Sequence, residues 1–514
     1  MSKTIIIIGA GLAGLSAALQ AAENGCNVKL VSSLPSERAQ SVMAEGGINA
    51  ALNTKDENDS PEEHFTDTIK AACGLADPNA VWGMTQAAPE LVHWLLKLGV
   101  KFNMSGYDDV DLRNFGGQKK KRTAFAQSDT GKQIMTAMID AVRRKEASGM
   151  VERVSHHSFL TLSLCGNICC GCVIRDEYSQ ETVELPGDAV IVATGGMHGL
   201  FGNTTGSLSN TGEVTAELFR LGVPLANGEM IQYHPTTVKC GGKRMLISEA
   251  ARGEGGRLFA MKDGKQWYFM EEKYPELGNL MPRDITAREI WKVSHESEVF
   301  LDMTEISEEI ISNKLSGLAD DCMTYLHKDI RKEPVSVLPG IHYFMGGILV
   351  DEQHRTPIQN LCAAGECCAQ YHGANRLGGN SLLGALYGGR VAAKSACEQA
   401  DVVDLSCATQ IDFPPASQIS EIKQLNKVMQ ETMGVVRNEN TLLNGIQTVQ
   451  ALTGNLPLLG MAVLKSALAR KESRGAHWRE DYPKSNDDDY LKTTVARFDG
   501  KQIQISFVPV PERR

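Results

Sequence analysis

The clearest pattern of apolar and polar positions lies in the first thirty residues of the chain. Residues 3–8 end in four consecutive isoleucines, a continuous apolar run such as a strand buried on both faces requires. A glycine-rich turn leads into residues 15–22, whose Ala and Leu content predicts a helix, and residues 27–31 predict a second, parallel strand. The chain therefore begins with a predicted strand–turn–helix–strand unit.

The turn of this unit has three spaced glycines, Gly9, Gly11 and Gly14. In a dinucleotide-binding unit the first forms the tight turn, the second lets the backbone approach a pyrophosphate, and the third lets helix pack on strand. The helix N-terminus then meets the phosphate charge. The second strand ends in Ser32, where many such sites carry an acid for the ribose. The unit predicts a dinucleotide site without choosing the cofactor, and an ordinary tight turn is the alternative.

Later strands favour FAD over NAD as the tightly held cofactor. Residues 188–192 predict a buried strand followed by Ala193-Thr194-Gly195-Gly196, a sequence common in flavoproteins with two dinucleotide folds. The buried pattern returns over 346–351 and 361–366, and Asn380-Ser381-Leu382 lie at the start of a predicted helix. The N-terminus of that helix would face an anionic group such as a reduced flavin ring.

The remaining regions have other patterns. Residues 236–339 mix short charged helices with loops, without the buried-strand pattern, and predict an inserted domain. Residues 418–475 predict amphipathic helices. Their apolar positions at roughly helical spacing include Leu425, Met429, Met433, Val436 and Leu442. The last forty residues are polar and then predict short strands.

Composition and charge narrow the function classes. A length of 514 residues predicts two or three domains, and 42% hydrophobic with 22% charged residues is typical of a soluble globular protein. The net charge of −10 argues against a nucleic-acid partner and against a basic membrane-binding face. No apolar stretch reaches the roughly eighteen residues of a membrane span, and a strand begins within four residues, so we expect no signal peptide and no direct membrane insertion.

Thirteen cysteines without a secretory signal indicate a reducing compartment. Four of them, at 165, 169, 170 and 172, could be metal ligands, but the flanking residues predict two strands around a Gly166-Asn167 turn. On such a strand Cys170 and Cys172 would share one face and Cys169 would lie on the other. We interpret these cysteines as small hydrophobic residues and predict no metal.

Eight further segments carry polar motifs in a fixed order. They are Arg38–Gly47, Asn114–Gly117, His234–Thr236, Glu249–Gly256, Pro282–Asp284, His342–Gly347, His372–Ser381 and Ser473–Pro483. Their order and spacing resemble the flavoprotein subunits of fumarate reductase and succinate dehydrogenase, a family that also includes L-aspartate oxidase. The resemblance covers nearly the whole chain.

The resemblance implies an α/β fold with a discontinuous FAD-binding domain of the two-dinucleotide type. Its parts would be residues 1–235 and 340–410, with an α+β capping domain inserted at 236–339. A C-terminal helical domain (411–490) and a C-terminal tail (491–514) would follow. In this family the dicarboxylate site lies between the cap and the flavin.

The resemblance also implies roles for single residues. Hydride would pass from reduced FAD to fumarate, and Arg283 would donate the proton, supplied through Glu249 and Arg252. The planar guanidinium of Arg376 suits a substrate carboxylate. The remaining substrate-binding residues would be His234, Ser248, His342 and Phe115. An isolated buried histidine or Arg–Glu pair is more often structural, so these roles depend on the motifs that contain the residues.

The residues expected at FAD are Gly9, Gly11, Gly14, Ser32, Gln40, Ser41, Gly46, Gly47, Ala193, Thr194, Gly195, Glu213, Glu366, Asn380, Ser381 and Leu382. Gln40 departs from the family, because membrane-bound members usually have a histidine there that is bonded covalently to FAD. Glutamine cannot form that bond, so we expect non-covalent FAD. A covalent bond generally raises the flavin potential, and its absence should favour fumarate reduction over succinate oxidation.

Three other interpretations compete with a fumarate reductase. Succinate dehydrogenase acting in the oxidative direction shares the same residues. L-Aspartate oxidase should hold an acid for the substrate amine, whereas the corresponding loop, Lys119–Arg122, is basic. A flavin-binding electron-transfer module would not need Arg283, His342 and Arg376. Flavoproteins of this branch usually receive electrons from an iron–sulfur subunit, so we expect such a partner, with or without a membrane anchor subunit, in the cytoplasm or at the cytoplasmic face of a membrane.

Overall fold

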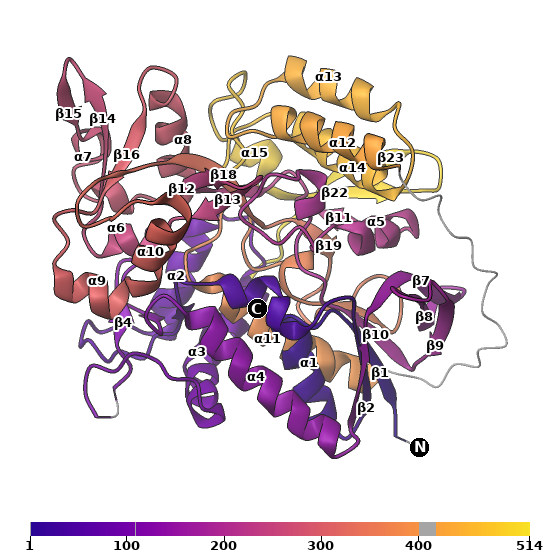
Figure 1. Cartoon of the computed structure of the whole chain (residues 1–514). Coiled ribbons are helices and arrows are strands. Elements are labelled where there is room, and N and C mark those ends of the chain that lie inside the picture. Colours follow the sequence, from indigo (N-terminus) through magenta and orange to yellow (C-terminus); the bar gives the residue numbers. More distant parts are fainter. Residues whose placement is uncertain (1, 108, 400–417) are drawn as a thin grey trace.

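The computed structural model describes residues 2–107, 109–399 and 418–514. It contains a five-stranded parallel sheet, whose strands β1, β2 and β10 lie at the lower right in Figure 1. The strand order is β20-β10-β1-β2-β6, and every neighbouring pair is parallel. The strands are β1 (Thr4–Ile8), β2 (Asn27–Ser32), β6 (Val151–Ser155), β10 (Ala189–Val192) and β20 (Leu361–Ala363). The apolar runs that predicted buried strands near residues 5, 28, 190 and 362 are confirmed.

Alternate residues of β1 face two different layers. Ile5 and Ile7 pack against helices α1 (Leu12–Glu23), α4 (Thr130–Ala147) and α11 (Asn380–Gln399). Ile6 and Ile8 pack against a three-stranded sheet and α5 (Glu213–Arg220). Helices α1 and α11 lie so close that a Cβ on Gly389 would come within 2.3 Å of the Ala13 carbonyl oxygen. Burial on both faces explains why β1 needs a continuous apolar sequence.

The three-stranded sheet consists of β7 (His157–Cys165), β8 (Ile168–Asp176) and β9 (Thr182–Pro186). Residues Gly166 and Asn167 connect β7 to β8, as predicted. The predicted alternation of the cysteines is wrong, because the register shifts between Ser163 and Leu164 and leaves Cys170 in a bulge. Cys169 and Cys172 therefore share one apolar core, and burial raises the pKa of Cys169 to about 12.

The segment predicted as the cap contains two small antiparallel sheets. One has the order β13 (Lys243–Leu246), β12 (Ile231–Cys240), β18 (Leu338–Phe344). The other has the order β15 (Lys265–Trp267), β14 (Arg257–Lys262), β16 (Val299–Asp302), β17 (Val335–Ser336). The absence of buried strands predicted here is wrong: β14 and β16 contribute Leu258, Ala260, Val299 and Leu301 to a core. Both strands are short and end at charged residues, Arg257 and Lys262 in β14 and Asp302 in β16, so neither leaves a long apolar run.

Helices α6 (Glu249–Gly253), α7 (Phe269–Lys273), α8 (Arg283–Val293), α9 (Glu308–Lys314) and α10 (Ser316–Asp321) complete this segment. Figure 1 shows most of it at the upper left, above the parallel sheet. The predicted boundaries at 235 and 339 fall inside β12 and β18.

The C-terminal part combines helices with a second sheet. Helices α12 (Ile419–Thr432), α13 (Glu439–Val449) and α14 (Asn455–Ala469) pack together over α5, with α15 (Asp487–Tyr490) after them. The second sheet has the order β21 (Cys368–Ala369), β19 (Gly347–Leu349), β11 (Leu225–Ala226), β22 (Lys492–Phe498), β23 (Ile503–Pro509). Val436 does not lie on a helix as predicted, because α12 ends at Thr432. The predicted boundary at 410/411 lies outside the described residues.

The remaining elements are α2 (Pro61–Ala71), α3 (Pro78–Leu98) and the short strands β3 (Ile48–Asn49), β4 (Leu112–Arg113) and β5 (Thr123–Ala124). None of the helices in the described ranges has the length and apolar character needed to cross a membrane.

Candidate functional site

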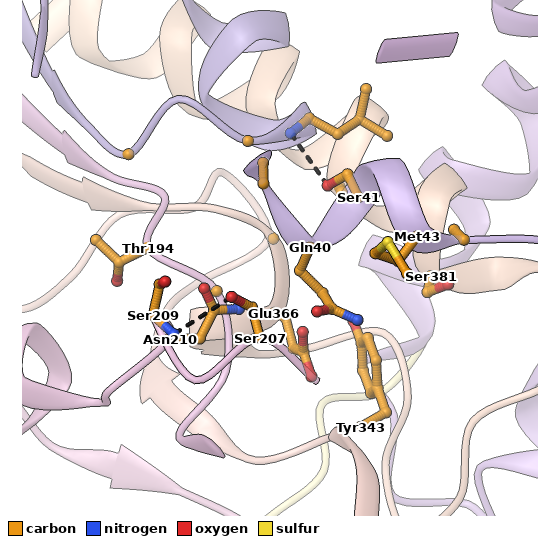
Figure 2. A pocket seen from close by; sticks show the side chains of 18 of the residues that line it. Gln40, Ser41, Met43, Thr194, Ser207, Ser209, Asn210, Tyr343, Glu366 and Ser381 are labelled. Atoms are coloured by element: carbon orange, nitrogen blue, oxygen red, sulfur yellow. Dashed lines mark hydrogen bonds between the residues drawn. The ribbon is translucent and has the colours of Figure 1, made fainter. Parts of the chain in front are cut away.

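A cavity of about 740 Å³ opens at the carboxyl ends of the parallel strands. Residues that directly follow β1, β2, β10 and β20 line it, at the edge where open α/β sheets bind their ligands. From there the cavity extends to β12, α6 and α8, so one continuous space joins the parallel sheet to the cap segment. Figure 2 shows part of its lining, including Gln40, Ser41, Tyr343 and Glu366.

The first turn forms a cradle that a side chain would obstruct. Gly9 has a φ of +110°, and a Cβ there would lie 2.3 Å from the Ala193 carbonyl oxygen. A Cβ on Gly14 would lie 1.8 Å from the Gly9 carbonyl oxygen, so Gly14 permits the close approach of helix and strand. Gly11 is the N-cap of α1 without a side-chain cap, while the Leu12 N–H donates to Ser41 Oγ at 3.3 Å (Figure 2). The open amides fit an anionic pyrophosphate.

Most residues expected at FAD line this cavity. Those that do are Gly9, Gly11, Ser32, Gln40, Ser41, Gly46, Gly47, Ala193, Thr194, Gly195, Glu213, Glu366, Ser381 and Leu382. Gly14 lies behind the turn, and Asn380 is buried behind the wall, where its side chain bonds Asn49 and His64. The side chain of Asn380 therefore belongs to a buried polar network, and its expected role at FAD stays a prediction.

Several lining residues were missed by the sequence prediction. Ser207, Ser209 and Asn210 come from the loop between β10 and α5, and Figure 2 shows them beside Glu366. The Ser209 N–H donates to Ser207 Oγ at 3.3 Å. The clustering of Ser, Asn and Gly in residues 206–212 marks a loop but does not indicate which way it faces. Arg38 and Arg175 also line the cavity and bring positive charge to this end.

Arg283 and Glu249 form a buried ion pair at the other end of the cavity. Arg283 begins α8, and its Nε and one terminal nitrogen donate to Glu249 Oε2 at 2.8 and 2.6 Å. Its other terminal nitrogen donates to Gln232 Oε1 at 3.2 Å. Arg252 lies one helical turn after Glu249, 3.4 Å from its Oε1, and does not line the cavity. The three residues expected to form a proton relay are therefore neighbours, and their role as a relay stays a prediction.

The charges of this cluster do not balance. Three guanidinium groups, of Arg252, Arg283 and Arg376, lie in the same buried region as the carboxylate of Glu249. The carboxylate of Glu366, on the cavity wall, also acts on Arg376. Burial alone would raise the pKa of Glu249, but the charges of Arg283 and Arg252 outweigh it and the pKa is lowered. Glu249 is therefore ionised near neutral pH, and among the described residues the three guanidinium groups still outnumber the carboxylates of Glu249 and Glu366. An anion bound from outside would compensate the excess positive charge.

Arg376 is the uncompensated cation that lies on the cavity wall. Its side chain is 2% exposed, sits over the Tyr343 ring at 4.4 Å, and pairs with no carboxylate among the described residues. Its Nε has no hydrogen-bond partner there either. Burial, with the positive charge of Arg283, lowers the pKa of Arg376 to about 9. A buried guanidinium without a partner is costly, so the site is built for an anion that arrives from outside.

Two histidines face each other in the same region. The rings of His234 and His342 lie 5.1 Å apart, and both residues line the cavity. Burial and the charge of Arg283 lower the pKa of each histidine well below its usual value, so both are neutral. His234 Nδ1 lies 3.0 Å from the Thr236 carbonyl oxygen and His342 Nδ1 2.7 Å from Thr205 Oγ1. These bonds fix both rings as neutral polar groups beside the arginines.

Ser248 and Phe115 complete the set expected at the substrate. Ser248 is the N-cap of α6 and lines the cavity. Phe115 also lines it, and a Cβ on Gly46 would lie 2.7 Å from the Phe115 ring. Glu45, next to Gly46, was missed: burial and the charges of Asp321 and Asp129 raise its pKa to about 8. The structure thus brings every residue expected at the substrate to one end of the cavity, with Arg252 directly behind.

The fold and cavity define a flavoprotein oxidoreductase of the FAD-binding α/β class. Residues 4–382 match the family model described as FAD binding domain, and residues 452–513 match that described as fumarate reductase flavoprotein C-term. The chain belongs to the family of FAD-dependent succinate dehydrogenase and fumarate reductase flavoprotein subunits. The family resemblance, the α/β fold and the enzyme class expected from the sequence are confirmed.

Named relatives match the chain over its full length. It is 38% identical to the succinate dehydrogenase flavoprotein subunit of Bacillus subtilis, covering 100% of this chain and 98% of that one. It is 32% identical to the 8-methylmenaquinol:fumarate reductase flavoprotein subunit of Wolinella succinogenes, covering 100% and 92%. A mutant of E. coli quinol fumarate reductase FrdA superposes with a TM-score of 0.90 at 27% identity, covering 99% and 97%. None of these is an L-aspartate oxidase.

Proposed function

We propose that the protein reduces fumarate to succinate as the flavoprotein subunit of a fumarate reductase. The observation that carries this proposal is the buried, unpaired guanidinium of Arg376 beside the Arg283–Glu249 pair. Fumarate brings two carboxylates, which can pair with the guanidinium groups of Arg376 and Arg283. Other dicarboxylates of similar size carry the same charge, so charge alone does not select fumarate. The alkene between the two carboxylates of fumarate can accept a hydride at one carbon and a proton at the other.

Substrate binding would orient the alkene. Arg376 would hold one carboxylate through its planar fork, while the neutral His234 and His342 rings and the Ser248 hydroxyl would bond the other oxygens. The glycine cradle would hold FAD, which in its reduced form would supply the hydride for one alkene carbon. The second carbon then takes a proton from Arg283, whose guanidinium lies against Glu249. Glu249 would then take a proton from the neighbouring Arg252 and pass it to Arg283, and Arg252 would regain its proton from solvent.

Anaerobic reoxidation tests the reaction directly. The purified protein is reduced with dithionite, excess reductant is removed, and the flavin absorbance is followed after fumarate is added. Recovery of the oxidised band with fumarate, together with succinate in equal amount to the flavin reoxidised, supports the proposal. Maleate, the cis isomer with the same charge, is the matched control and should reoxidise the flavin far more slowly. Equal rates with both isomers would contradict a geometrically defined dicarboxylate site.

Replacing Arg376 tests its role as an anion receptor. In Arg376→Met the KM for fumarate should rise by about a hundredfold, because one charge-assisted contact is lost. The ligand-free protein should become more stable, by about 1–3 kcal/mol, because an unpaired buried cation is replaced by an apolar side chain of similar length. Urea unfolding without fumarate measures the second effect. A less stable variant would mean that Arg376 has a structural partner.

We also propose that FAD is held without a covalent bond. Gln40 lines the cavity where relatives usually carry the flavin-linking histidine, and its amide is not a nucleophile. Precipitation with trichloroacetic acid should release all flavin into the supernatant. A flavin potential above that of the fumarate/succinate couple would count against the proposed direction.

Partners follow from the assignment as a subunit. We propose that an iron–sulfur protein delivers the electrons, with or without a membrane anchor subunit, and that the complex faces the cytoplasm. Relatives are themselves named as subunits. Affinity purification of the tagged full-length chain from its native cells, followed by iron and acid-labile sulfide analysis, would detect such a partner. Purification of an active, iron-free enzyme able to use reduced nicotinamide would contradict it.

Succinate oxidation is the second candidate, and the 38% identity to a succinate dehydrogenase subunit favours it. The same residues would work in reverse. The ratio of fumarate reduction to succinate oxidation, measured with one viologen dye poised at the couple's potential, distinguishes the two directions.

A further inference from the structure

Another buried histidine lies behind the cavity wall, outside the residues expected at the substrate. His198 follows β10 at the start of a short 3-10 helix, His198–Leu200, is fully buried and does not line the cavity. Its ring meets Phe344 edge to face with centroids 4.9 Å apart. On another side, a Cβ on Gly206 would lie 2.1 Å from the ring, so only glycine fits there. The ring is therefore held in one position.

The hydrogen bonds of His198 indicate which ring nitrogen carries the proton. Nδ1 lies 3.0 Å from Thr204 Oγ1, and the same oxygen accepts the Gly206 N–H at 3.1 Å. A hydroxyl has one proton to donate, and giving it to Nδ1 satisfies both groups. In the neutral ring the proton then resides on Nε2.

Nε2 points toward the cavity residue Glu366. It is buried without a hydrogen-bond partner among the described residues, and Glu366 Oε1 lies 3.7 Å from it. The same carboxylate oxygen accepts the Phe344 N–H at 3.1 Å. The Glu366 side chain remains 13% exposed and faces the cavity (Figure 2), so a small rotation would close the remaining gap. An unpaired buried N–H is costly, which favours that contact.

We propose that His198 is a positioning residue for the cofactor. Its Nε2–H and the Phe344 N–H hold the Glu366 carboxylate so that its outer oxygen accepts a hydrogen bond from a hydroxyl of FAD. Thr204 supports this by keeping the proton on Nε2. The inference rests on the proposed place of FAD beside Glu366, but it does not depend on fumarate as the substrate.

The loop that carries Thr204 also reaches the substrate end. The next residue, Thr205, contacts His342 Nδ1 at 2.7 Å, and its N–H donates to the Ile341 carbonyl oxygen at 2.9 Å. A general collapse of this loop would disturb both ends of the cavity. A test must therefore separate the loss of one N–H from the loss of the loop.

FAD affinity of the apoprotein, measured by quenching of flavin fluorescence, provides the test. His198→Met removes the N–H at similar volume and should raise the Kd about tenfold, the size expected for a hydrogen bond to a charged group. His198→Gln restores an N–H near the same place and should stay within about threefold of the parent. In a Glu366→Gln background, His198→Met should change the Kd less than about twofold, because the charged acceptor is gone.

Thr204 gives a second route if His198→Met does not fold. Thr204→Val leaves the imidazole in place but removes the donor to Nδ1, so the Kd should rise, while Thr204→Ser should restore it. A buried histidine away from the cavity, His354, is the matched control: its Nδ1 bonds the Ala363 carbonyl oxygen at 2.7 Å, and His354→Met should leave the Kd within about twofold.

Equal rises in the Kd for FAD in His198→Met and His198→Gln would overturn the proposal. So would a double variant, His198→Met with Glu366→Gln, whose rise in Kd equals the product of the two single rises. So would a loss in His354→Met as large as that in His198→Met. A parent protein that binds FAD tightly but never reacts with fumarate would contradict the proposed function alone.

Discussion

The two ends of the cavity bind by different means. At the FAD end the backbone forms the site: Gly9, Gly11 and Gly14 remove side chains so that amides and carbonyls come close to the ligand and to each other. At the substrate end side chains form the site, and charges of Arg283 and Arg376 lie in a buried region with too few carboxylates. The first end is determined by shape, and the second by uncompensated charge.

This difference predicts which substitutions should weaken binding at each end of the cavity. A backbone cradle tolerates changes of charge but no added volume, whereas a charge cluster tolerates changes of volume but no loss of a cation. Within the substrate end, Arg283 is paired and Arg376 is not. The paired residue should therefore matter mostly for turnover and the unpaired one mostly for binding.

The largest effect is expected for Arg283→Leu, which removes both the cation and the proposed proton donor. Fumarate reduction with a viologen donor should fall at least about a thousandfold in kcat, at the upper end of general acid catalysis. FAD content, measured from the absorbance of the purified protein, should stay at the parent level because Arg283 lies at the other end of the cavity. Loss of flavin together with activity would show that the two ends are not independent.

Arg288 is the control for this variant. It lies on the same helix, over the Trp478 ring at 4.0 Å and away from the large cavity. Arg288→Leu should keep kcat within about threefold, since the lost cation–π contact is worth about 1 kcal/mol.

The next largest effect should come from the glycine cradle, where two substitutions of equal size have different outcomes. A Cβ on Gly11 would meet nothing closer than 3.7 Å, so Gly11→Ala should fold with parent stability but bind FAD at least tenfold more weakly, about 1.4 kcal/mol. A Cβ on Gly14 would lie 1.8 Å from the Gly9 oxygen, so Gly14→Ala should lose more than about 3 kcal/mol of folding free energy. Urea unfolding of the apoproteins and FAD titration separate the two.

This contrast also explains what could be predicted from the sequence. The cradle is local: the isoleucines of β1, the glycines and the α1 helix follow one another, so period and spacing predict them. The substrate end joins segments near residues 115, 234, 249, 283, 342 and 376, and no local pattern relates them. Only the resemblance to the family predicted that these segments come together. No motif predicts that the Asn380 side chain turns away from the cavity to bond Asn49.

Glu45 and the cysteine hairpin are two further features that the local sequence could not predict. The pKa of Glu45 depends on burial and on Asp129 and Asp321, which come from two other parts of the chain. The bulge at Cys170 shifts the alternation of a strand whose ends were correctly predicted. Both are consequences of tertiary packing rather than of local sequence.

Glu45 lies where the two ends meet, and its raised pKa makes stability depend on pH. The unfolded carboxyl ionises near pH 4.5, while in the folded protein the pKa of the half-buried Glu45 is raised to about 8. The free energy of unfolding of the apoprotein should therefore fall between pH 4.5 and 8 through this group. Glu45→Gln lacks this contribution, so its stability relative to the parent should be unchanged below pH 4.5 and greater by a few kcal/mol above pH 8.

Urea unfolding at pH 4.5, 6, 7 and 8.5 measures this difference. A constant offset between Glu45→Gln and the parent at every pH would mean that the carboxyl ionises normally. A second variant, Asp321→Asn, removes one of the charges that raise the pKa and should move the parent's stability loss to lower pH.

The smallest effect should come from Ser248→Thr, which adds one methyl group at the substrate end. Ser248 caps α6 with its side-chain oxygen, and threonine caps nearly as well, so stability should change by less than about 0.5 kcal/mol. The hydroxyl stays on the cavity wall, so kcat should not change and the KM for fumarate should shift less than about threefold, as expected for a single methylene-sized contact. Ser248→Ala keeps the volume but removes the hydroxyl, and should lose about 1 kcal/mol of folding free energy together with a larger rise in KM. If the methyl group of threonine had the larger effect, volume rather than polar contact would determine binding at this end, and the contrast with the glycine cradle would fail.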